Sequence, residues 1–312
     1  MRDRFVKTLA ELAEADRRIT LITGDLGFGV LDGFRTKFPT QYINAGVAEQ
    51  NMTLLATGLA IEGRIVFTYS IANFPTLRCL EMVRNGAAYH GLPVKVVAVG
   101  GGFSYGSLGI SHHATEDLAI MRALPGIDVF VPGGQAETEA ATRAMATRPG
   151  TGYLRLDKDP GVEVDDSAPF EPGVPRLIAP GRGPVALLAS GGILSEAMAA
   201  RKLLLADGVD AAVYSGHSLR PLRSQSVVDI VRQHSIIVAI EEHTVVGGLS
   251  SALLEVMADA SCWPTRFIRV GLQDRFSSAV GSQTYLRQMY GLDAETIAAR
   301  VRTAVGRAAS ET

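Results

Sequence analysis

Short runs of β-branched and other apolar residues alternate along the chain with longer segments of helical periodicity. In the first half, the runs that predict strands are 19–23, 64–68, 94–99 and 127–131. In the second half they are 185–189, 211–214, 235–240 and 266–270. Strands that alternate with helices are typical of parallel sheets covered by helices on both faces. The pattern therefore predicts an α/β protein made of two doubly wound domains, each with a mostly parallel sheet.

A proline-rich segment separates the two halves of the chain. It contains six prolines, among glycines and acidic residues, at Pro160, Pro169, Pro172, Pro175, Pro180 and Pro184. Prolines and glycines at this density interrupt helices and strands. We therefore predict a first domain at 1–165, a linker at 166–183 and a second domain at 184–312.

Composition narrows the class of protein. A chain of 312 residues, 47% hydrophobic and 20% charged, is long enough to bury a core in each of two domains. Its net charge of -2 gives no electrostatic reason to expect nucleic acid or an anionic membrane as a partner. Residues 1–18 carry charges every few positions, unlike a signal peptide, and no segment approaches ~20 uncharged apolar residues. Cys79 and Cys262 have no CxxC spacing, so we expect a reducing, cytoplasmic location.

Segment 44–52, NAGVAEQNM, places a single acid between small residues and an apolar run at 53–60. A lone glutamate at this position, Glu49, has two interpretations. It is either a solvated charge that offsets a helix dipole, or a buried acid with a chemical role. The pattern alone leaves both open.

Segment 100–109 is rich in glycine and follows the predicted strand 94–99. It contains no GxGxxG, and its only G-x4-G, from Gly101 to Gly106, is followed by serine rather than lysine, so it is not a nucleotide loop of either kind. We expect a flexible loop at the sheet edge where open α/β folds bind ligands, with a plain surface loop as the alternative. The next histidines, His112 and His113, are adjacent and lack the spacing of metal ligands. We therefore expect one imidazole to face a ligand.

Three segments together resemble the pyrimidine-binding domain of the transketolase family of thiamine diphosphate enzymes. They are NAGVAEQNM at 44–52, YSIANF at 69–74 and GISHHATEDLAIMRALPGIDVFVPG at 109–133. The second half resembles the carboxy-terminal domain of the same family at 190–222 and 241–255. The resemblance covers nearly the whole chain, and it implies thiamine diphosphate as the cofactor.

The resemblance also implies roles for individual residues near the cofactor. Glu49 takes the position of the acid that hydrogen-bonds N1′ of the aminopyrimidine and favours the tautomer that removes the thiazolium C2 proton. Phe74 takes the position of an aromatic residue that stacks on the pyrimidine; its alternative is an ordinary core phenylalanine. Asp25 and Leu26 match positions near the cofactor, although glycine and aspartate also form ordinary turns there. Tyr69 is a weaker candidate for lining the same pocket.

Other residues are candidates for contact with the substrate. His112 aligns with the family's active-site histidine, and an imidazole with an ordinary pKa of about 6.5 can donate or accept a proton near neutrality. His113 is the second candidate, with loop anchoring as its alternative. Arg78 and Ser104 are further candidates for substrate binding. Arg275 and His243 are weaker candidates for the rim of the site.

One expected motif is missing. The family binds the divalent metal of the cofactor through a GDG followed later by asparagine, a ligand set that suits a hard cation. The chain has Gly24-Asp25-Leu26-Gly27 and no GDG, so we expect it to supply no metal ligand. The resemblance then implies that Mg²⁺ or another divalent metal is held mainly by a partner, the N-terminal transketolase subunit that carries GDG and asparagine. We expect an α2β2 heterotetramer with the cofactor at the interface.

Three functions remain in competition. The first, favoured by overall similarity, is transfer of a two-carbon ketol unit from a ketose donor to an aldehyde acceptor. The second is the β subunit of a 2-oxo acid dehydrogenase E1, or a deoxyxylulose-phosphate-synthase-like enzyme, both of which decarboxylate first. The third is a non-catalytic assembly subunit, against which Glu49, Phe74 and His112 at family spacing argue. Loop 100–108 lacks the histidine and aspartate of sugar-phosphate transketolases, which leaves an unphosphorylated or unusual acceptor open.

Overall fold

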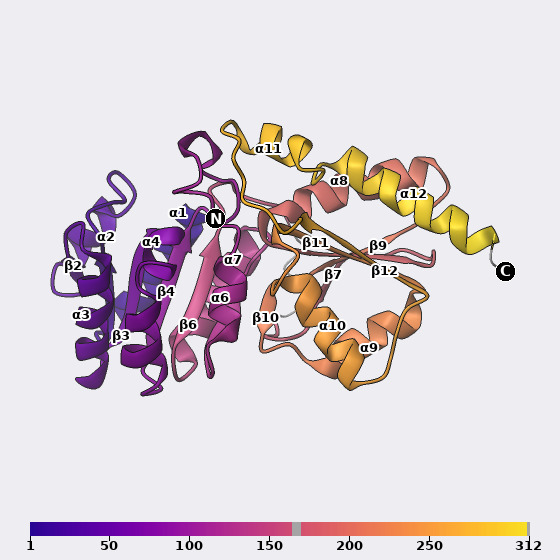
Figure 1. Ribbon diagram of the computed structural model, residues 1–312. Helices are drawn as coiled ribbons and strands as arrows, with labels where there is room; N and C mark the ends of the chain where they lie inside the picture. Colours follow the sequence, from indigo (N-terminus) through magenta and orange to yellow (C-terminus); the bar gives the residue numbers. More distant parts are fainter. Residues whose placement is uncertain (164–169, 311–312) are drawn as a thin grey trace.

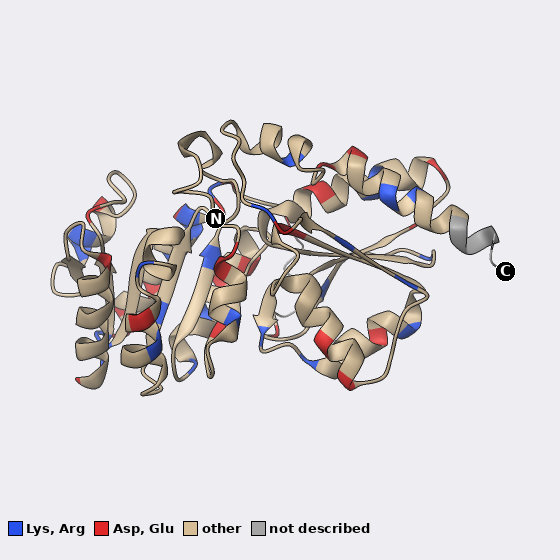
Figure 2. Ribbon diagram, in the orientation of Figure 1, with Lys and Arg blue, Asp and Glu red and all other residues tan. Residues whose placement is uncertain are grey.

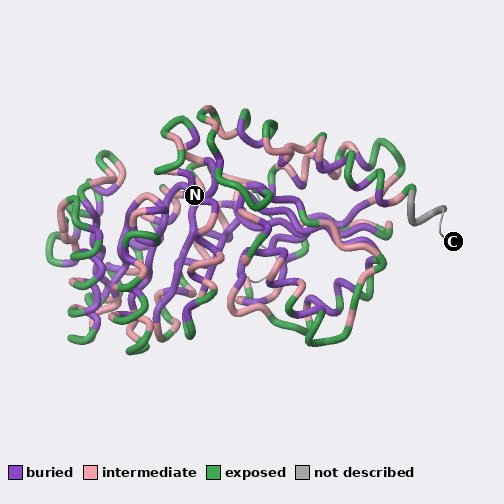
Figure 3. The backbone as a smooth tube through the Cα atoms, viewed as in Figure 1, coloured by how far each residue is buried: buried purple, intermediate pink, exposed green. Residues whose placement is uncertain are grey.

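Two α/β domains lie side by side in the computed structural model, which describes residues 1–163 and 170–310 (Figure 1). Side chains are described up to Gly306. The central strands of both sheets are almost entirely buried, whereas the edge strands are only partly buried and the outer faces of the helices are exposed (Figure 3). Charged residues of both signs are spread over both domains (Figure 2). No described helix has the length and apolarity needed to cross a membrane.

The first sheet has seven strands in the order β10-β5-β6-β4-β3-β1-β2. All neighbours are parallel except β10, which pairs antiparallel with β5. The strands are β1 (Ile19–Thr23), β2 (Tyr42–Asn44), β3 (Ile65–Ile71), β4 (Val94–Val99), β5 (Asp128–Phe130), β6 (Gly152–Leu156) and β10 (Ser218–Arg220). The helical segments of this domain are α1 (Arg2–Ala15), α2 (Asp32–Lys37), α3 (Glu49–Ile61), α4 (Asn73–Thr76), α5 (Leu80–Met82), η1 (Val83–Ala88), η2 (Gly106–Leu108), α6 (Asp117–Ala123) and α7 (Gln135–Thr147).

Successive strand residues of the first sheet enter two different cores. On one face of the sheet, α1 and α7 cover Leu21, Phe67 and Val97. On the other face, α3 and α6 cover Ile22 and Val66, which lie one position away from Leu21 and Phe67. Strands that are apolar on both faces are expected when helices cover both sides of a parallel sheet. The prediction of a doubly wound first domain is therefore confirmed.

The second sheet has five strands in the order β12-β11-β8-β9-β7. Its strands are β7 (Arg176–Ala179), β8 (Val185–Ser190), β9 (Ala212–Ser215), β11 (Ile236–Thr244) and β12 (Arg266–Leu272). Its helical segments are η3 (Gly191–Ile193), α8 (Leu194–Ala206), α9 (Ser224–Gln233), α10 (Leu249–Asp259), α11 (Gln283–Met289) and α12 (Ala294–Ser310). Helices α8 and α12 pack together on one face, and α9 and α10 cover the other.

The predicted linker 166–183 needs a correction. Residues 166–169 lie outside the described part of the chain, but 176–179 form β7, which pairs antiparallel with β9. Proline is tolerated at the ends of edge strands, and Pro175 and Pro180 flank this one. Proline density therefore marked a change of domain but hid a short strand within it.

Buried charges join the two domains. The Glu242 carboxylate on β11 accepts hydrogen bonds from Phe103 N at 2.5 Å, from Gln283 Nε2 at 2.9 Å and from Arg287 Nε. Arg155 on β6 donates through Nη2 to the Glu242 carbonyl oxygen at 2.9 Å. A strand of the first sheet is thus tied directly to a strand of the second.

The glycine-rich segment after β4 packs against this junction. Gly101 and Gly102 are buried, and a Cβ on either would collide with the side chain of Arg155 or of Glu242 respectively. The expectation of a flexible loop was therefore wrong for this stretch. These glycines are needed because the backbone passes directly over a buried ion cluster.

Candidate active site

Glu49 is the first residue of α3 and lies at the carboxyl edge of the first sheet. It is only 3% exposed, and a Cβ on Gly24, which follows β1, would come 3.5 Å from its Cγ. A carboxylate at a helix N-terminus is stabilised by the helix dipole. Glu49 is thus a helix-start residue as the first interpretation held, but it is buried rather than solvated, as the second required.

Arg78 is the ion-pair partner of this carboxylate. Its Nη1 lies 2.8 Å from Glu49 Oε2, and its side chain is 50% exposed where that of Glu49 is 4% exposed. The guanidinium carbon also lies 5.1 Å from the centroid of the Phe74 ring. Arg78 therefore contacts both residues to which the resemblance assigns the pyrimidine.

Phe74 and His112 meet although they are far apart in sequence. Their ring centroids lie 5.3 Å apart with an interplanar angle of 75°. Asn73 Nδ2 donates to the carbonyl oxygens of His113, at 2.7 Å, and Ser111, at 3.2 Å, which fixes the histidine loop to α4. The structure thus places Glu49, Arg78, Phe74 and His112 in one chain of contacts.

His112 is positioned to act as a neutral imidazole. Burial, and to a smaller extent the neighbouring His113, lower the pKa of His112 below its ordinary value of 6.5. Its Nδ1 lies 3.0 Å from Ser111 Oγ. A neutral ring can accept a proton near pH 7 and return it from the imidazolium that forms, as a proton-transfer residue must.

His113 points away from this cluster. It is 1% exposed, its Nε2–H donates to the Gly106 carbonyl oxygen at 3.1 Å, and its ring meets Phe103 at 5.2 Å. Within the described residues its Nδ1 has no hydrogen-bond partner. These contacts match the alternative role of anchoring the loop.

Asp25 and Leu26 lie in the turn after β1, next to Gly24. The Asp25 carboxylate accepts from Asn44 Nδ2 at 2.8 Å, and the Leu26 carbonyl oxygen accepts from Thr23 Oγ1 at 3.0 Å. Asp25 is exposed and adopts a positive φ of 57°. Both residues thus border the Glu49 edge, and their contact with a cofactor stays a prediction.

Two other candidates, Tyr69 and Ser104, make their contacts elsewhere. Tyr69 is 1% exposed, stacks on Phe5 at 6.0 Å in the core beneath α1, and its pKa is raised by burial. Ser104 donates through Oγ to Asp157 Oδ1 at 3.0 Å, towards the domain junction. The described contacts do not bring either side chain onto Glu49 or Phe74.

The two rim candidates also have partners of their own. His243 is fully buried, and its Nδ1–H donates to the Thr244 carbonyl oxygen at 2.7 Å, so the expectation that it reaches the rim was wrong. Arg275 lies over the ring of Tyr290 at 5.2 Å.

Sequence reasoning missed Tyr105, which lies beside His112, and Lys158, which lies beside Tyr105. The ring of Tyr105 lies 6.3 Å from that of His112, and Lys158 Nζ lies 5.2 Å from the Tyr105 ring centroid. Lys158 is exposed and brings positive charge to this side of the site. A single lysine after an unrecognised strand carries no sequence signal that would have identified it.

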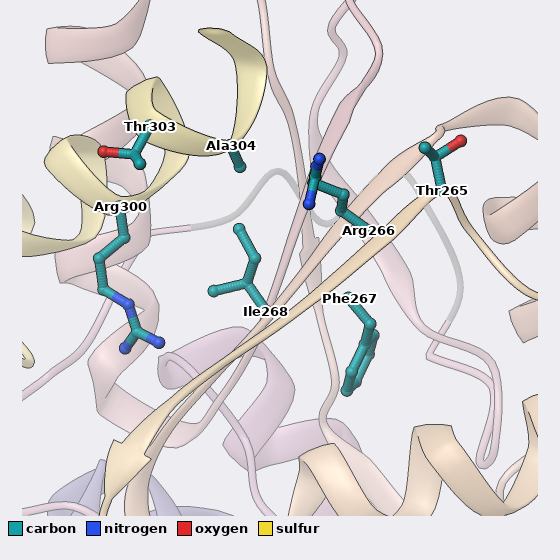
Figure 4. A pocket seen from close by; sticks show the side chains of 7 residues that line it. All are labelled: Thr265, Arg266, Phe267, Ile268, Arg300, Thr303 and Ala304. Atoms are coloured by element: carbon teal, nitrogen blue, oxygen red, sulfur yellow. The ribbon is translucent and has the colours of Figure 1, made fainter. Parts of the chain in front are cut away.

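The structure also contains a cavity of about 460 Å³ in the second domain, between β12 and α12 (Figure 4). It is lined by Thr265, Arg266, Phe267, Ile268, Arg300, Thr303 and Ala304. The residues that line it include no acid, thiol or imidazole. They belong to the second domain, whereas Glu49 lies in the first. The cavity is therefore not the reacting centre.

The Glu49 site fits one half of thiamine diphosphate. A buried carboxylate beside an aromatic ring offers an acceptor and a flat apolar surface to an aminopyrimidine, and a Cβ on Gly46 would have open space around it. For the diphosphate and its metal, the described residues contain no group of three or more histidine, cysteine, aspartate or glutamate side chains arranged to hold a cation. A site of this kind, at the carboxyl edge of a doubly wound sheet, is typical of the pyrimidine-binding domains of thiamine diphosphate enzymes.

Comparison with known proteins agrees with this class. Residues 1–160 match the family model of the transketolase pyrimidine binding domain, and residues 178–297 match that of the transketolase C-terminal domain. The chain therefore belongs to the transketolase family and comprises its pyrimidine-binding and C-terminal domains. The resemblance found in the sequence is confirmed.

Three similar proteins illustrate the relationship. The chain is 34% identical to a "Putative transketolase C-terminal section" of Methanocaldococcus jannaschii, over 96% of this chain and 95% of that protein. It is 35% identical to the "6-deoxy-6-sulfo-D-fructose transketolase subunit SqwH" of Clostridium sp. (strain MSTE9), over 95% and 92% of the two chains. A solved structure described as "Split gene transketolase, inactive beta4 tetramer" superposes with a TM-score of 0.89 at 35% identity, covering 98% of both chains.

Proposed function

We propose that this chain is the C-terminal subunit of a two-component, thiamine diphosphate-dependent transketolase that moves a two-carbon ketol unit from a ketose to an aldehyde. The observation that carries the proposal is the buried Glu49 carboxylate, joined through Arg78 to Phe74 and His112, in a chain that consists of the two C-terminal transketolase domains. The names of similar proteins, which include a transketolase subunit and a split-gene transketolase, support it.

Three residues of the cluster, Glu49, Phe74 and His112, each have a task in this proposed reaction. When bound, thiamine diphosphate would supply the nucleophilic carbon for the reaction. Glu49 holds a hydrogen bond at N1′ of the aminopyrimidine, and its burial keeps water from competing for that bond. Phe74 offers its ring to the flat pyrimidine, and His112 exchanges a proton with an oxygen of the substrate.

A partner chain completes the site in this proposal. The diphosphate and its Mg²⁺ need the GDG and asparagine ligands that this chain lacks, so activity requires the N-terminal subunit, in an α2β2 assembly. Large apolar side chains are exposed along the Glu49 edge, with Phe28 76% and Val47 75% exposed. Exposed apolar groups beside a functional site are typical of protein interfaces. A cytoplasmic location suits the two cysteines, both of which are free.

The test is a reconstitution. The chain is mixed with a candidate partner that carries GDG and asparagine, thiamine diphosphate and Mg²⁺, and is screened against ketose donors and aldehyde acceptors. We expect ketol transfer by the mixture, without carbon dioxide release and with neither chain active alone. Stoichiometric carbon dioxide would instead assign the decarboxylating alternative. A complex that forms without binding the cofactor would assign the assembly role.

A further inference from the structure

The guanidinium of Arg78 makes two contacts at once. Its Nη1 lies 2.8 Å from Glu49 Oε2, and its central carbon lies 5.1 Å from the centroid of Phe74. The proposed function assigns these same two groups, the carboxylate and the ring, to the aminopyrimidine of the cofactor.

A guanidinium and an aminopyrimidine offer similar chemistry to such a pair. Both are planar, both can present an N–H to a carboxylate, the aminopyrimidine doing so when N1′ carries a proton, and both stack on aromatic faces. Within the described chain, Arg78 is the side chain that holds the Glu49 carboxylate in an ion pair. A pyrimidine that takes the same carboxylate oxygen and ring face must displace it.

We propose that Arg78 is a placeholder: before the cofactor arrives it occupies the contacts of the aminopyrimidine, and it moves into solvent when the cofactor binds. This inference rests on the proposed function. The ion pair gives the buried Glu49 carboxylate a partner whenever the pyrimidine is not bound, because a buried charge without a partner is strongly destabilising.

The side chain is free to leave while its backbone stays in place. The Arg78 side chain is 50% exposed, so its guanidinium can reach water by rotation alone. The Arg78 carbonyl oxygen accepts from Gln50 Nε2 at 3.2 Å, which ties this backbone to the start of α3. The guanidinium regains its hydration when it leaves, and the pyrimidine then takes its place as the partner of the Glu49 carboxylate.

The placeholder lowers the affinity of the site. If a ligand binds only when Arg78 is displaced, its apparent affinity equals its intrinsic affinity multiplied by the fraction of molecules in which the site is open. Removing the guanidinium should therefore tighten binding. A purely structural arginine predicts the opposite, because its loss would disorder Glu49 and weaken binding.

The experiment measures binding of the free aminopyrimidine half of thiamine, as its hydroxymethyl derivative, to the full chain by NMR titration. Arg78→Met should bind this probe about 3- to 10-fold more tightly than the natural chain. Arg78→Lys keeps the charge but not the planar stacking group, and it should fall between the two. The matched control is Arg84→Met, because Arg84 is exposed and its Nη1 contacts Asn85 Oδ1 at 2.6 Å; its affinity should be unchanged.

The outcomes separate this inference from the proposed function. Unchanged, weaker or undetectable binding of the probe to Arg78→Met, in a variant whose amide spectrum stays folded, overturns the placeholder. If the reconstituted pair transfers ketol while Arg78→Met fails to tighten the probe, only the placeholder is refuted. If Arg78→Met tightens the probe but the pair transfers no ketol, the reaction is refuted and the placeholder stands.

Discussion

Arg287→Met should destabilise the junction between the two domains. Arg287 on α11 is paired with Glu242 on β11, and their side chains are 10% and 6% exposed. Removing the guanidinium leaves a buried carboxylate with two neutral donors, Phe103 N at 2.5 Å and Gln283 Nε2 at 2.9 Å. Loss of one partner from a buried ion pair costs about 3–5 kcal/mol, and the remaining donors place this case at the lower end, near ~3 kcal/mol.

Urea unfolding followed by circular dichroism measures the loss. A second variant measures the part due to Glu242: Glu242→Gln combined with Arg287→Met removes both charges of this pair, and it should recover about 1–2 kcal/mol relative to Arg287→Met alone. The control is Arg302→Met, because the pair of Arg302 with Asp207 is 41% and 46% exposed and should contribute less than about 1 kcal/mol. A loss below ~1 kcal/mol for Arg287→Met, or a double variant no more stable than the single one, would refute this reasoning.

Two further predictions concern buried groups elsewhere. Burial, and then the charge of Arg176, lower the pKa of His217 from 6.5 to about 4. Between these two pH values the unfolded chain therefore binds a proton at this histidine, whereas the folded chain does not. As the pH drops through this range, the free energy of unfolding decreases by roughly 3 kcal/mol from this group. In urea unfolding, His217→Leu should reduce the change in the free energy of unfolding between pH 7 and 4.5, whereas His90→Gln, at an exposed position, should not. Parallel plots of this free energy against pH for His217→Leu and the natural chain would contradict the prediction. Gly101→Ala should cost about 1–3 kcal/mol because its methyl group meets buried Arg155, while Gly58→Ala, with open space on α3, should be neutral or stabilising; equal effects would disprove the clash.

The sequence identified the main features of the fold because apolar periodicity is a local signal. Each of the eight predicted strands is present, with ends that differ by a few residues. Strand β6 was missed because Arg155 interrupts its apolar run, although the side chain is buried through hydrogen bonds to carbonyl oxygens. Strand β10 was missed because it crosses from the second domain to pair with β5, a long-range pairing that no local pattern encodes.

The candidate site was predictable in part. Glu49, Phe74 and His112 follow the ends of different elements, and a parallel sheet gathers such ends at one edge. The packing of Tyr69 on Phe5 was not visible, because a strand buried on both faces gives no sign of which face each side chain takes. The contact of Arg78 with Glu49 was not visible, since it depends on how the turn between α4 and α5 is set against α3.

Glu49 tests the proposed reaction most directly. Glu49→Gln keeps the size of the side chain and removes its charge, so the reconstituted pair should lose about 10²-fold or more in kcat while assembly is unchanged. Glu62→Gln is the matched control, because Glu62 caps the far end of the same helix in solvent and should leave kcat unaltered. Ketol transfer by Glu49→Gln at the rate of the unmodified pair would contradict the assignment of this carboxylate.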